Sequence, residues 1–363
     1  MNRKYAIPND YNIYCALSTG KVSETILRKL FLNRGIIVSP KTRRENLANY
    51  FASLMQGYND YQDISLQHQK LERSEYISSK EISSELNLSD LGNSLNNLKD
   101  RLDIRISNTE LKDVKTSILG DSVAIEFEYE KFYPEKQMFS QIEQKKALLT
   151  FKKSEEGKFY IEHPSTNEML EWADSIIDLL ENEDENINIQ EIDLSGITNP
   201  EDYWSFFNEL TESFGSYERK NVVEILFKDI SKGVETEDSE EYQLISASYR
   251  GNQLHLSDDF KQKFNDGYKL YKFTWDCVDK SISEPDKYRL SIKISYNKEG
   301  RNNFSFITKG LYKNKDGIYN KSLQSLSNAE EEKFNRLVFA KGLELLKNLE
   351  NQTGLQAKIE TDE

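Results

Sequence analysis

The 363-residue chain has few of the residues that most often carry metal or redox chemistry. Its two cysteines, Cys15 and Cys277, are widely separated and suggest no disulfide framework. Its three histidines, His68, His163 and His255, show neither an i, i+4 spacing nor a neighbouring cysteine, so zinc sites of the ordinary kinds are not expected. We therefore expect a protein of the reducing cytoplasm that holds no metal and no cofactor.

Long apolar runs and common catalytic signatures are also missing. The chain contains no run of about 18 apolar residues, and MNRKYAIPNDYNIY at its start lacks an apolar signal-peptide core. The stretch CALSTGKVS ends like a phosphate-binding loop, but Cys15 and Val22 stand where that loop requires Gly and Ser or Thr. The G-x-S-x-G elbow of hydrolases is absent as well. We expect no membrane segment, and no catalytic residue can be assigned.

Aromatic residues and acidic charge are plentiful. The 20 Tyr and 18 Phe indicate a folded chain, because disordered proteins are poor in aromatics. The length is too great for one ordinary hydrophobic core and favours two or three domains.

The formal net charge is −14, yet the charge is unevenly distributed along the chain. Acids are few in residues 1–56, whereas this stretch holds nine bases, which are Arg3, Lys4, Lys21, Arg28, Lys29, Arg34, Lys41, Arg43 and Arg44. Such asymmetry suggests contact with a polyanion, although a solvated basic face without a partner remains an alternative.

Residues 22–56 predict two helices around an extended connector. Ser23 is a candidate N-cap, and Gly35 suits the left-handed residue that ends the first helix. Ile36-Ile37-Val38 favour extended backbone. Thr42-Arg43-Arg44-Glu45 has the form of a capping box, with Thr42 as N-cap of a second helix that buries Leu47, Tyr50, Phe51 and Leu54.

This helix, extended loop and basic second helix resembles the SAP and HeH family of small DNA-binding modules. The matching residues are Leu27, Leu30, Gly35 to Ser39, Thr42, Arg43, Arg44, Leu47 and Tyr50, about a tenth of the chain, while Pro40 and the aromatic character of Tyr50-Phe51 depart from the pattern. The resemblance implies that basic residues near the loop contact the DNA backbone. A helix start also favours phosphate through its free N–H groups. The predicted DNA-binding residues are Lys29, Arg34, Lys41, Thr42, Arg43 and Arg44. The alternative is a helical hairpin whose arginines face the protein's own groups.

The rest of the chain predicts an α+β fold. We expect a basic module at residues 1–60 and a helical linker at residues 61–102. The linker would contain a helix at about 79–87. The alternative for this segment is a helix-turn-helix. Strands then precede a helix twice, which predicts antiparallel-sheet-plus-helix domains at 103–186 and 187–363, the second ending in a long helix. Residues 155–202 are strongly acidic and indicate either a solvated linker and helix or a surface for a basic protein partner.

Three functional hypotheses follow. The first is a non-catalytic bacterial protein, with a role in a multi-component system such as phage defence, that binds DNA through its N-terminal module and a protein partner through its acidic body. The second is a metal-dependent nuclease, because Asp121, Glu143 and Lys145, or a set around Glu156-Gly157-Lys158, fit the loose spacing of PD-(D/E)xK enzymes. The third is an acidic structural or interaction protein without nucleic-acid contact.

Overall fold

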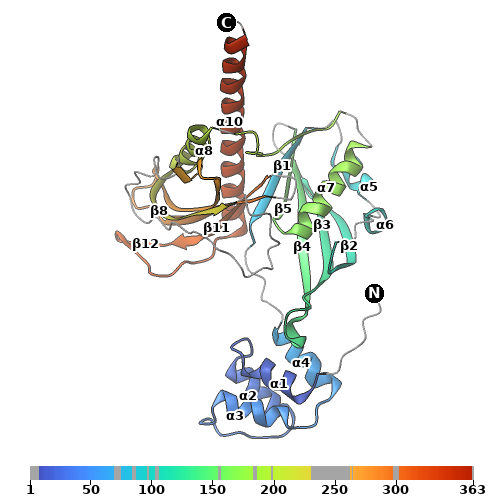
Figure 1. The fold of residues 1–363 in the computed structure, drawn as a ribbon. Coiled ribbons are helices and arrows are strands. Elements are labelled where there is room, and N and C mark those ends of the chain that lie inside the picture. Colours follow the sequence, from blue (N-terminus) through green and yellow to red (C-terminus); the bar gives the residue numbers. More distant parts are fainter. Residues whose placement is uncertain are drawn as a thin grey trace. The chain divides into compact units, whose positions relative to one another are not determined.

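The computed structural model describes residues 8–68, 75–83, 87–95, 98–102, 106–153, 157–182, 186–197, 199–229, 262–263, 265–296 and 302–361. Antiparallel strands and helices occur largely in separate runs, and an N-terminal helical region precedes the strands, so the predicted α+β class is confirmed (Figure 1). The chain divides into two compact units. Unit 1 comprises Met1–Arg73, Asn96–Thr116 and Ile125–Leu148, and unit 2 comprises Ser74–Leu95, Ser117–Ala124 and Leu149–Glu363.

Unit 1 begins with four helices, which are α1 (Asp10–Ser18), α2 (Glu24–Asn33), α3 (Arg44–Ala52) and α4 (Tyr58–His68). Their apolar faces form one core, in which Leu27, Phe31 and Phe51 are fully buried. Phe139 from the short 3-10 helix η1 (Met138–Ser140) joins this core. The prediction of a buried Tyr50 is wrong, because its side chain is 47% exposed although its ring stacks on that of Phe31.

The strands form one large sheet and a small hairpin. The larger sheet has the order β2-β3-β4-β5-β1-β11-β10-β9-β8-β7, and β6 also pairs with β1. Its members are β1 (Ile77–Ser83), β2 (Thr109–Leu119), β3 (Ser122–Phe132), β4 (Ile142–Lys153), β5 (Phe159–Pro164), β6 (Asn188–Gln190), β7 (Ser213–Phe214), β8 (Tyr217–Asp229), β9 (Tyr268–Asp279), β10 (Lys287–Tyr296) and β11 (Asn302–Tyr312). The hairpin joins β12 (Asn314–Lys315) and β13 (Ile318–Tyr319).

The segment 77–102 differs most from its prediction. A helix was expected at about 79–87, but Ile77–Ser83 is strand β1, which pairs with both β5 and β11. Its neighbours fix the extended backbone, since Ser78 hydrogen-bonds Asn303 and Glu81 pairs with Lys158. Two short helices follow, α5 (Leu88–Ser94) and α6 (Leu98–Arg101). The helix-turn-helix alternative required the missing helix, so it is withdrawn.

Strands β3, β4 and β5 agree with the sequence pattern. On β3, Val123, Ile125 and Phe127 are fully buried, as the alternation predicts. Strands β4 and β5 pair in antiparallel register. Helix α7 (Asn167–Glu181) follows them, is capped by Thr166 and buries Trp172.

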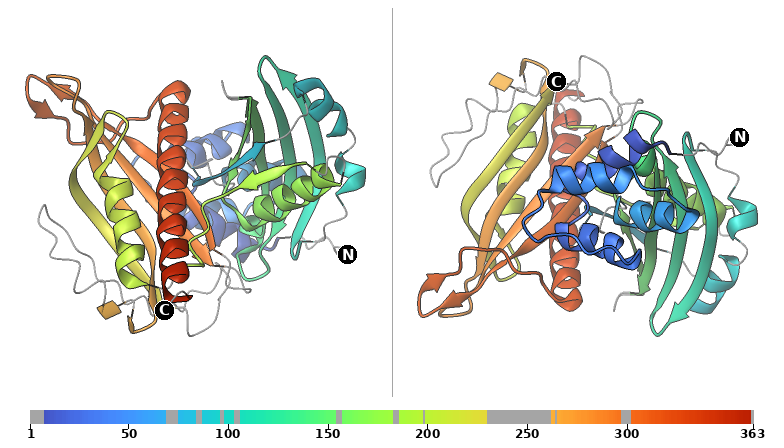
Figure 2. Two further views of the ribbon diagram at one scale, coloured as in Figure 1. Left: turned by 90° about the horizontal axis from the view of Figure 1, so that it is seen from above. Right: turned by 90° about the horizontal axis from the view of Figure 1, so that it is seen from below.

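The C-terminal part of unit 2 packs two helices on one face of strands β8 to β11. These are α8 (Pro200–Glu212) and the long helix α10 (Asn328–Thr361), which lie side by side on that face (Figure 2). The core between them includes Phe206, Trp275 and Phe334. The expected long final helix is present, and its inward face includes Phe334, Val338 and Leu345. The hydroxyl of Ser327, just before its first residue, accepts from the backbone N–H of Glu330.

Several expectations cannot be compared with the structure. The possible strand at 242–256 and the turns at 155–157 and 298–300 fall wholly or partly outside the described residues. Within the described part of the chain, no helix is both long and apolar enough to cross a membrane.

Candidate nucleic-acid interface

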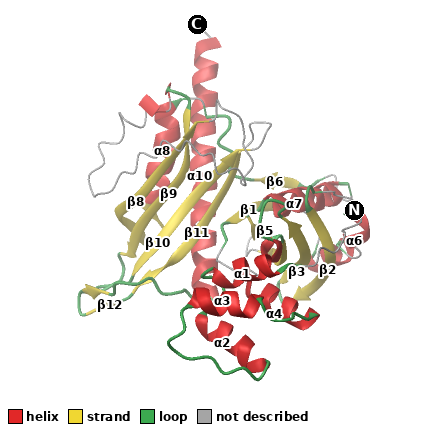
Figure 3. Cartoon of the chain, turned by 60° about the horizontal axis from the view of Figure 1, so that its bottom comes forward, coloured by secondary structure: helices red, strands yellow, loops and turns green. Residues whose placement is uncertain are grey.

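The candidate interface is built on α2, α3 and the loop between them (Figure 3). Ser23 accepts from the N–H of Ile26 and caps α2, as predicted. Gly35 has a φ of +72°, a backbone conformation that favours glycine, and the N–H of Ile36 bonds back to Phe31. The chain therefore leaves α2 by a tight reversal, and Ile36 and Val38 return to pack against the helical core while Ile37 is 89% exposed.

The predicted capping box of α3 is wrong. The helix begins at Arg44, its N-cap residue is Arg43, and no side chain caps it. Thr42 still belongs to the preceding turn, because its N–H bonds to the carbonyl of Ser39. An arginine side chain has no acceptor, so it cannot satisfy the first N–H groups of the helix. The start of α3 therefore offers N–H groups without a side-chain acceptor.

Arg28 on α2 holds this loop in place. Its guanidinium donates to the carbonyl oxygens of Ser39, Pro40 and Thr42 at 2.7, 3.0 and 2.9 Å. It also lies 3.7 Å from a carboxylate oxygen of Glu24. Five N–H donors in a rigid fork allow one arginine to make such a set of contacts. This role could not be predicted from sequence, because the three carbonyls lie 11 to 14 residues away.

Arg34, a predicted DNA contact, is bound inside unit 1. Its Nε donates to Oδ1 of Asp60 at 3.2 Å, and its Nη1 donates to the carbonyl of Met55 at 2.8 Å. Its Nη2 reaches the side chain of Gln56 at 2.8 Å, and its guanidinium lies 4.7 Å from the ring centre of Phe51. Arg34 thus ties the end of α2 to the segment before α4, and it is removed from the candidate DNA contacts.

Arg44 is also used by the fold. Its Nη1 donates to the carbonyl oxygens of Leu17, Thr19 and Val22, with a distance of 2.9 Å to Thr19. These carbonyls belong to the end of α1 and the following turn, where helix carbonyls lack intrahelical partners. The prediction that Arg44 contacts DNA is therefore not supported by its position.

Lys29, Lys41 and Arg43 have a different environment. All three are exposed. Within the described residues, none of their side chains forms an ion pair or hydrogen bond. Lys29 lies on α2, and Lys41 and Arg43 flank Thr42 at the start of α3. Thr42 itself is half-buried, and its carbonyl is occupied by Arg28. The six predicted residues thus divide into three solvent-directed cations and three residues engaged in the fold.

The nuclease alternative finds no support in the positions of its residues. The carbonyl of Asp121 accepts from the N–H of Lys153, at one end of β4. Glu143 lies near the other end of the same strand, ten residues away, which is about 33 Å at the rise of a strand. Glu143 is buried and lies 3.3 Å from Lys136. Asp121 and Glu143 therefore cannot share one metal ion.

Other candidates for chemistry are likewise occupied or isolated. Lys158 pairs with Glu81 at 2.7 Å, and Glu156 lies outside the described residues. Cys277 is fully buried, and burial raises the pKa of its thiol. In the described part of the chain, no three His, Cys, Asp or Glu side chains are grouped as metal ligands would be.

Part of the acidic stretch 155–202 neutralises the half-buried Lys80. Lys80 lies between Asp174 and Glu191, at 2.8 and 2.9 Å. Although burial opposes its charge, these two carboxylates raise the pKa of Lys80. The exposed face of α7 nevertheless keeps a row of acids at helical spacing, which are Glu171, Asp174, Asp178 and Glu181.

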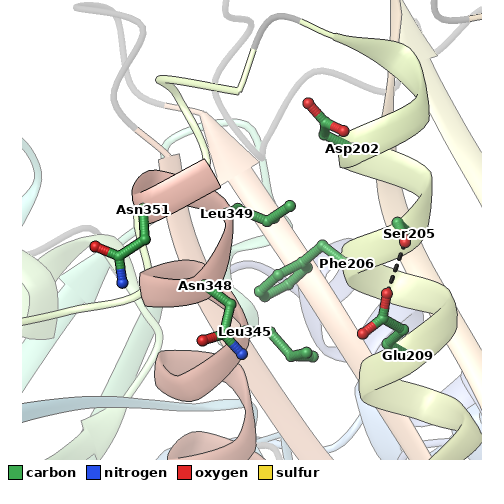
Figure 4. A pocket seen from close by; sticks show the side chains of 8 residues that line it. All are labelled: Asp202, Ser205, Phe206, Glu209, Leu345, Asn348, Leu349 and Asn351. Atoms are coloured by element: carbon green, nitrogen blue, oxygen red, sulfur yellow. Dashed lines mark hydrogen bonds between the residues drawn. The ribbon is translucent and has the colours of Figure 1, made fainter. Parts of the chain in front are cut away.

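A groove of about 350 Å³ lies between α8 and α10 (Figure 4). Phe206, Leu345 and Leu349 supply its apolar floor, and the hydroxyl of Ser205 donates to Glu209 at 2.7 Å. Its lining contains no histidine, cysteine or lysine. The groove therefore offers neither a nucleophile with a base nor a cation for an anionic substrate.

Comparison with known proteins does not identify the chain. No family model matches it, and no curated protein matches it. Among solved structures, it is similar to the crystal structure of DynU16, a protein in the dynemicin biosynthetic locus, with 7% sequence identity and a TM-score of 0.20. The match covers 75% of this chain and 98% of that one. Agreement at this level carries no argument about function.

Proposed function

We propose that the protein binds duplex DNA through its N-terminal helices, by contacts from Lys29, Lys41 and Arg43 to backbone phosphates. The observation that carries the proposal is the position of exposed Lys41 and Arg43 at the start of α3, which no side chain caps, with exposed Lys29 on the preceding helix α2. The start of a helix binds phosphate groups, because its free N–H groups and the positive end of the helix dipole add to the charge of the side chains.

The rigidity of the loop supports this proposal. Arg28 binds three successive parts of the turn that carries Lys41 and Arg43, so these residues extend from a braced segment. A preorganised surface loses less entropy when it binds. Contacts of this kind fix a protein on DNA but carry little sequence information. The expected activity is therefore salt-sensitive binding with weak sequence preference.

The acidic row on α7 supports a second part of the proposal, a protein partner with a basic surface. Glu171, Asp178 and Glu181 are exposed on one helix face. Partial desolvation of this carboxylate, together with repulsion from Glu168 and Asp174, raises the pKa of Glu171. A basic partner would relieve this repulsion, and a non-catalytic adaptor in a multi-component bacterial system would combine both contacts.

Binding of a labelled 20-base-pair duplex at low salt tests the DNA proposal. The variant Lys29→Gln/Lys41→Gln/Arg43→Gln should weaken binding strongly while its thermal unfolding stays close to that of the wild type. The matched control is Lys280→Gln/Lys321→Gln/Lys347→Gln, which changes the charge equally at exposed positions of unit 2. Absence of wild-type binding, or equal losses in both variants, would refute the proposal.

A further inference from the structure

A second cationic surface lies on unit 2, on strands β9, β10 and β11. One face of these strands is apolar and packs against α8 and α10, with Phe273, Trp275 and Ile292 in the core. Because side chains alternate along a strand, the intervening residues point to the opposite face. That face carries five cations, which are Lys272, Lys287, Arg289, Lys293 and Lys309.

The register places these cations next to one another. Lys272 on β9 is directly opposite Lys293 on β10, and Arg289 is opposite Asp276. Lys309 belongs to β11 at a bulge beside Arg289. Along β10, the distance from residue 287 to residue 293 is about 20 Å at the rise of a strand. The face is therefore a strip of positive charge, and its length would suit several phosphates of one strand.

Carboxylates neutralise this strip incompletely. Glu224 pairs with Lys272 at 2.6 Å, and Asp276 binds Arg289 through two hydrogen bonds of 2.7 and 3.0 Å. Asp276 also pairs with Lys287 at 3.6 Å, so two carboxylates serve three of the five cations. Lys309 is exposed and forms no ion pair within the described residues. Desolvation, together with the charges of Lys272 and Arg289, lowers the pKa of Lys309. An added anion at this position would relieve the repulsion.

Tyrosines alternate with the cations. Lys287 lies 4.8 Å from the ring centre of Tyr312 and 4.9 Å from that of Tyr319, and Arg289 lies 5.1 Å from Tyr312. Lys293 lies 5.6 Å from the ring of Tyr271. These three tyrosines are half-buried. Many proteins bind single-stranded nucleic acid with aromatic rings beside cations on the face of a sheet. The cations contact phosphates, and the bases stack on the rings.

The floor of this face is well ordered. Ser291 is fully buried, and its hydroxyl lies 2.8 Å from that of Thr274 and 2.9 Å from that of Tyr76. The hydroxyl of Ser305 donates to the carbonyl of Lys293 at 3.0 Å. Buried polar groups that satisfy one another fix the strands beneath the charged side chains.

We infer that this face of β9 to β11 is a binding surface for a single strand of nucleic acid, distinct from the duplex site on the N-terminal helices. Single-stranded nucleic acid is favoured over an acidic peptide because the face offers aromatic rings as well as charge. Nucleic-acid bases would stack on the tyrosine rings, whereas a peptide of acidic residues has no aromatic group that could do so.

Fluorescence anisotropy with labelled oligo(dT) of 20 nucleotides tests this inference on the full-length chain. Lys293→Gln/Lys309→Gln should raise the Kd about tenfold and reduce the salt slope by about 1.4, at about 0.7 per lost phosphate contact. Lys309→Gln alone, at an exposed position, should give about half that change in slope. The control Lys280→Gln/Lys347→Gln should leave both quantities unchanged.

Two further arms separate the inference from its alternatives. Ultraviolet crosslinking to oligo(dT) should label peptides that contain Tyr271, Tyr312 or Tyr319, and it should persist in the Lys29→Gln/Lys41→Gln/Arg43→Gln variant. Labels confined to the N-terminal helices would overturn the inference while leaving the duplex proposal intact. Competition by polyglutamate as effective as that by unlabelled oligo(dT), at equal charge, would also overturn it.

Discussion

Arg44 donates a 2.9 Å hydrogen bond to the carbonyl oxygen of Thr19, so a cation at the start of α3 binds the turn that follows α1. The same guanidinium group also contacts the carbonyls of Leu17 and Val22. Basic residues in the N-terminal helices therefore have two separate roles. Some satisfy backbone carbonyls and side chains of the fold, and others extend into solvent.

Substitution of Arg44 should reduce stability rather than affinity. Arg44→Lys keeps the charge but cannot reproduce the planar fork, and it should lower the free energy of unfolding by about 2 kcal/mol, the scale of charged hydrogen bonds. Urea unfolding monitored by circular dichroism measures this change. A variant with wild-type stability and weakened DNA binding would contradict the role given to Arg44.

Arg34 and Asp60 should be energetically coupled. The carboxylate accepts from Arg34 and from the N–H of Gly57, and although burial opposes the effect, these bonds lower the pKa of Asp60. A double-mutant cycle with Arg34→Ala and Asp60→Ala should give a coupling of about 1 kcal/mol. Additive effects of the two single changes would show that the contact does not stabilise unit 1.

Much of the fold follows from local sequence pattern. The alternation of Val123, Ile125 and Phe127 identified β3, and Ser23 and Gly35 marked the two ends of α2. Strand β1 escaped prediction because ISSKEIS buries polar side chains, including Ser78, Ser79 and Glu81. The partners that stabilise these polar residues lie on strands distant in sequence, and the spacing of hydrophobic residues does not predict such pairing.

The candidate site was predictable as a region but not as a set of residues. Charge counting pointed to a basic segment within residues 1–56, and the candidate interface remains placed there as a proposal. It could not distinguish Arg43 from Arg44, because the acceptors of Arg44 lie 22 to 27 positions earlier in the chain. Arg28 was overlooked for the same reason. Tertiary contacts decided which cations remain available to a ligand.

Stability should depend on pH through His163. The residue is 1% exposed, its Nδ1 lies 3.0 Å from the carbonyl of Pro164, and its Nε2 has no hydrogen-bond partner among the described residues. Burial lowers the pKa of His163 to about 4, against about 6.5 in an unfolded chain. Between these values the unfolded chain binds the proton that the folded one excludes, so the free energy of unfolding falls as the pH drops.

Between the two pKa values of His163, the free energy of unfolding should fall by up to about 3 kcal/mol relative to a variant without the titrating ring. Urea unfolding at pH 7.0, 6.0, 5.0 and 4.5, for the wild type and for His163→Gln, measures the difference. The stability advantage of the wild type should shrink as the pH falls. Parallel pH profiles for the two proteins would exclude His163 as the cause.

The salt dependence of duplex binding tests the central claim most directly. A plot of log Kd against log salt for the wild type and for Lys29→Gln/Lys41→Gln/Arg43→Gln compares the number of phosphate contacts. Three lost contacts should reduce the slope by about 2.7, at about 0.9 per phosphate. An unchanged slope in this variant would contradict the assignment of Lys29, Lys41 and Arg43 to the DNA backbone.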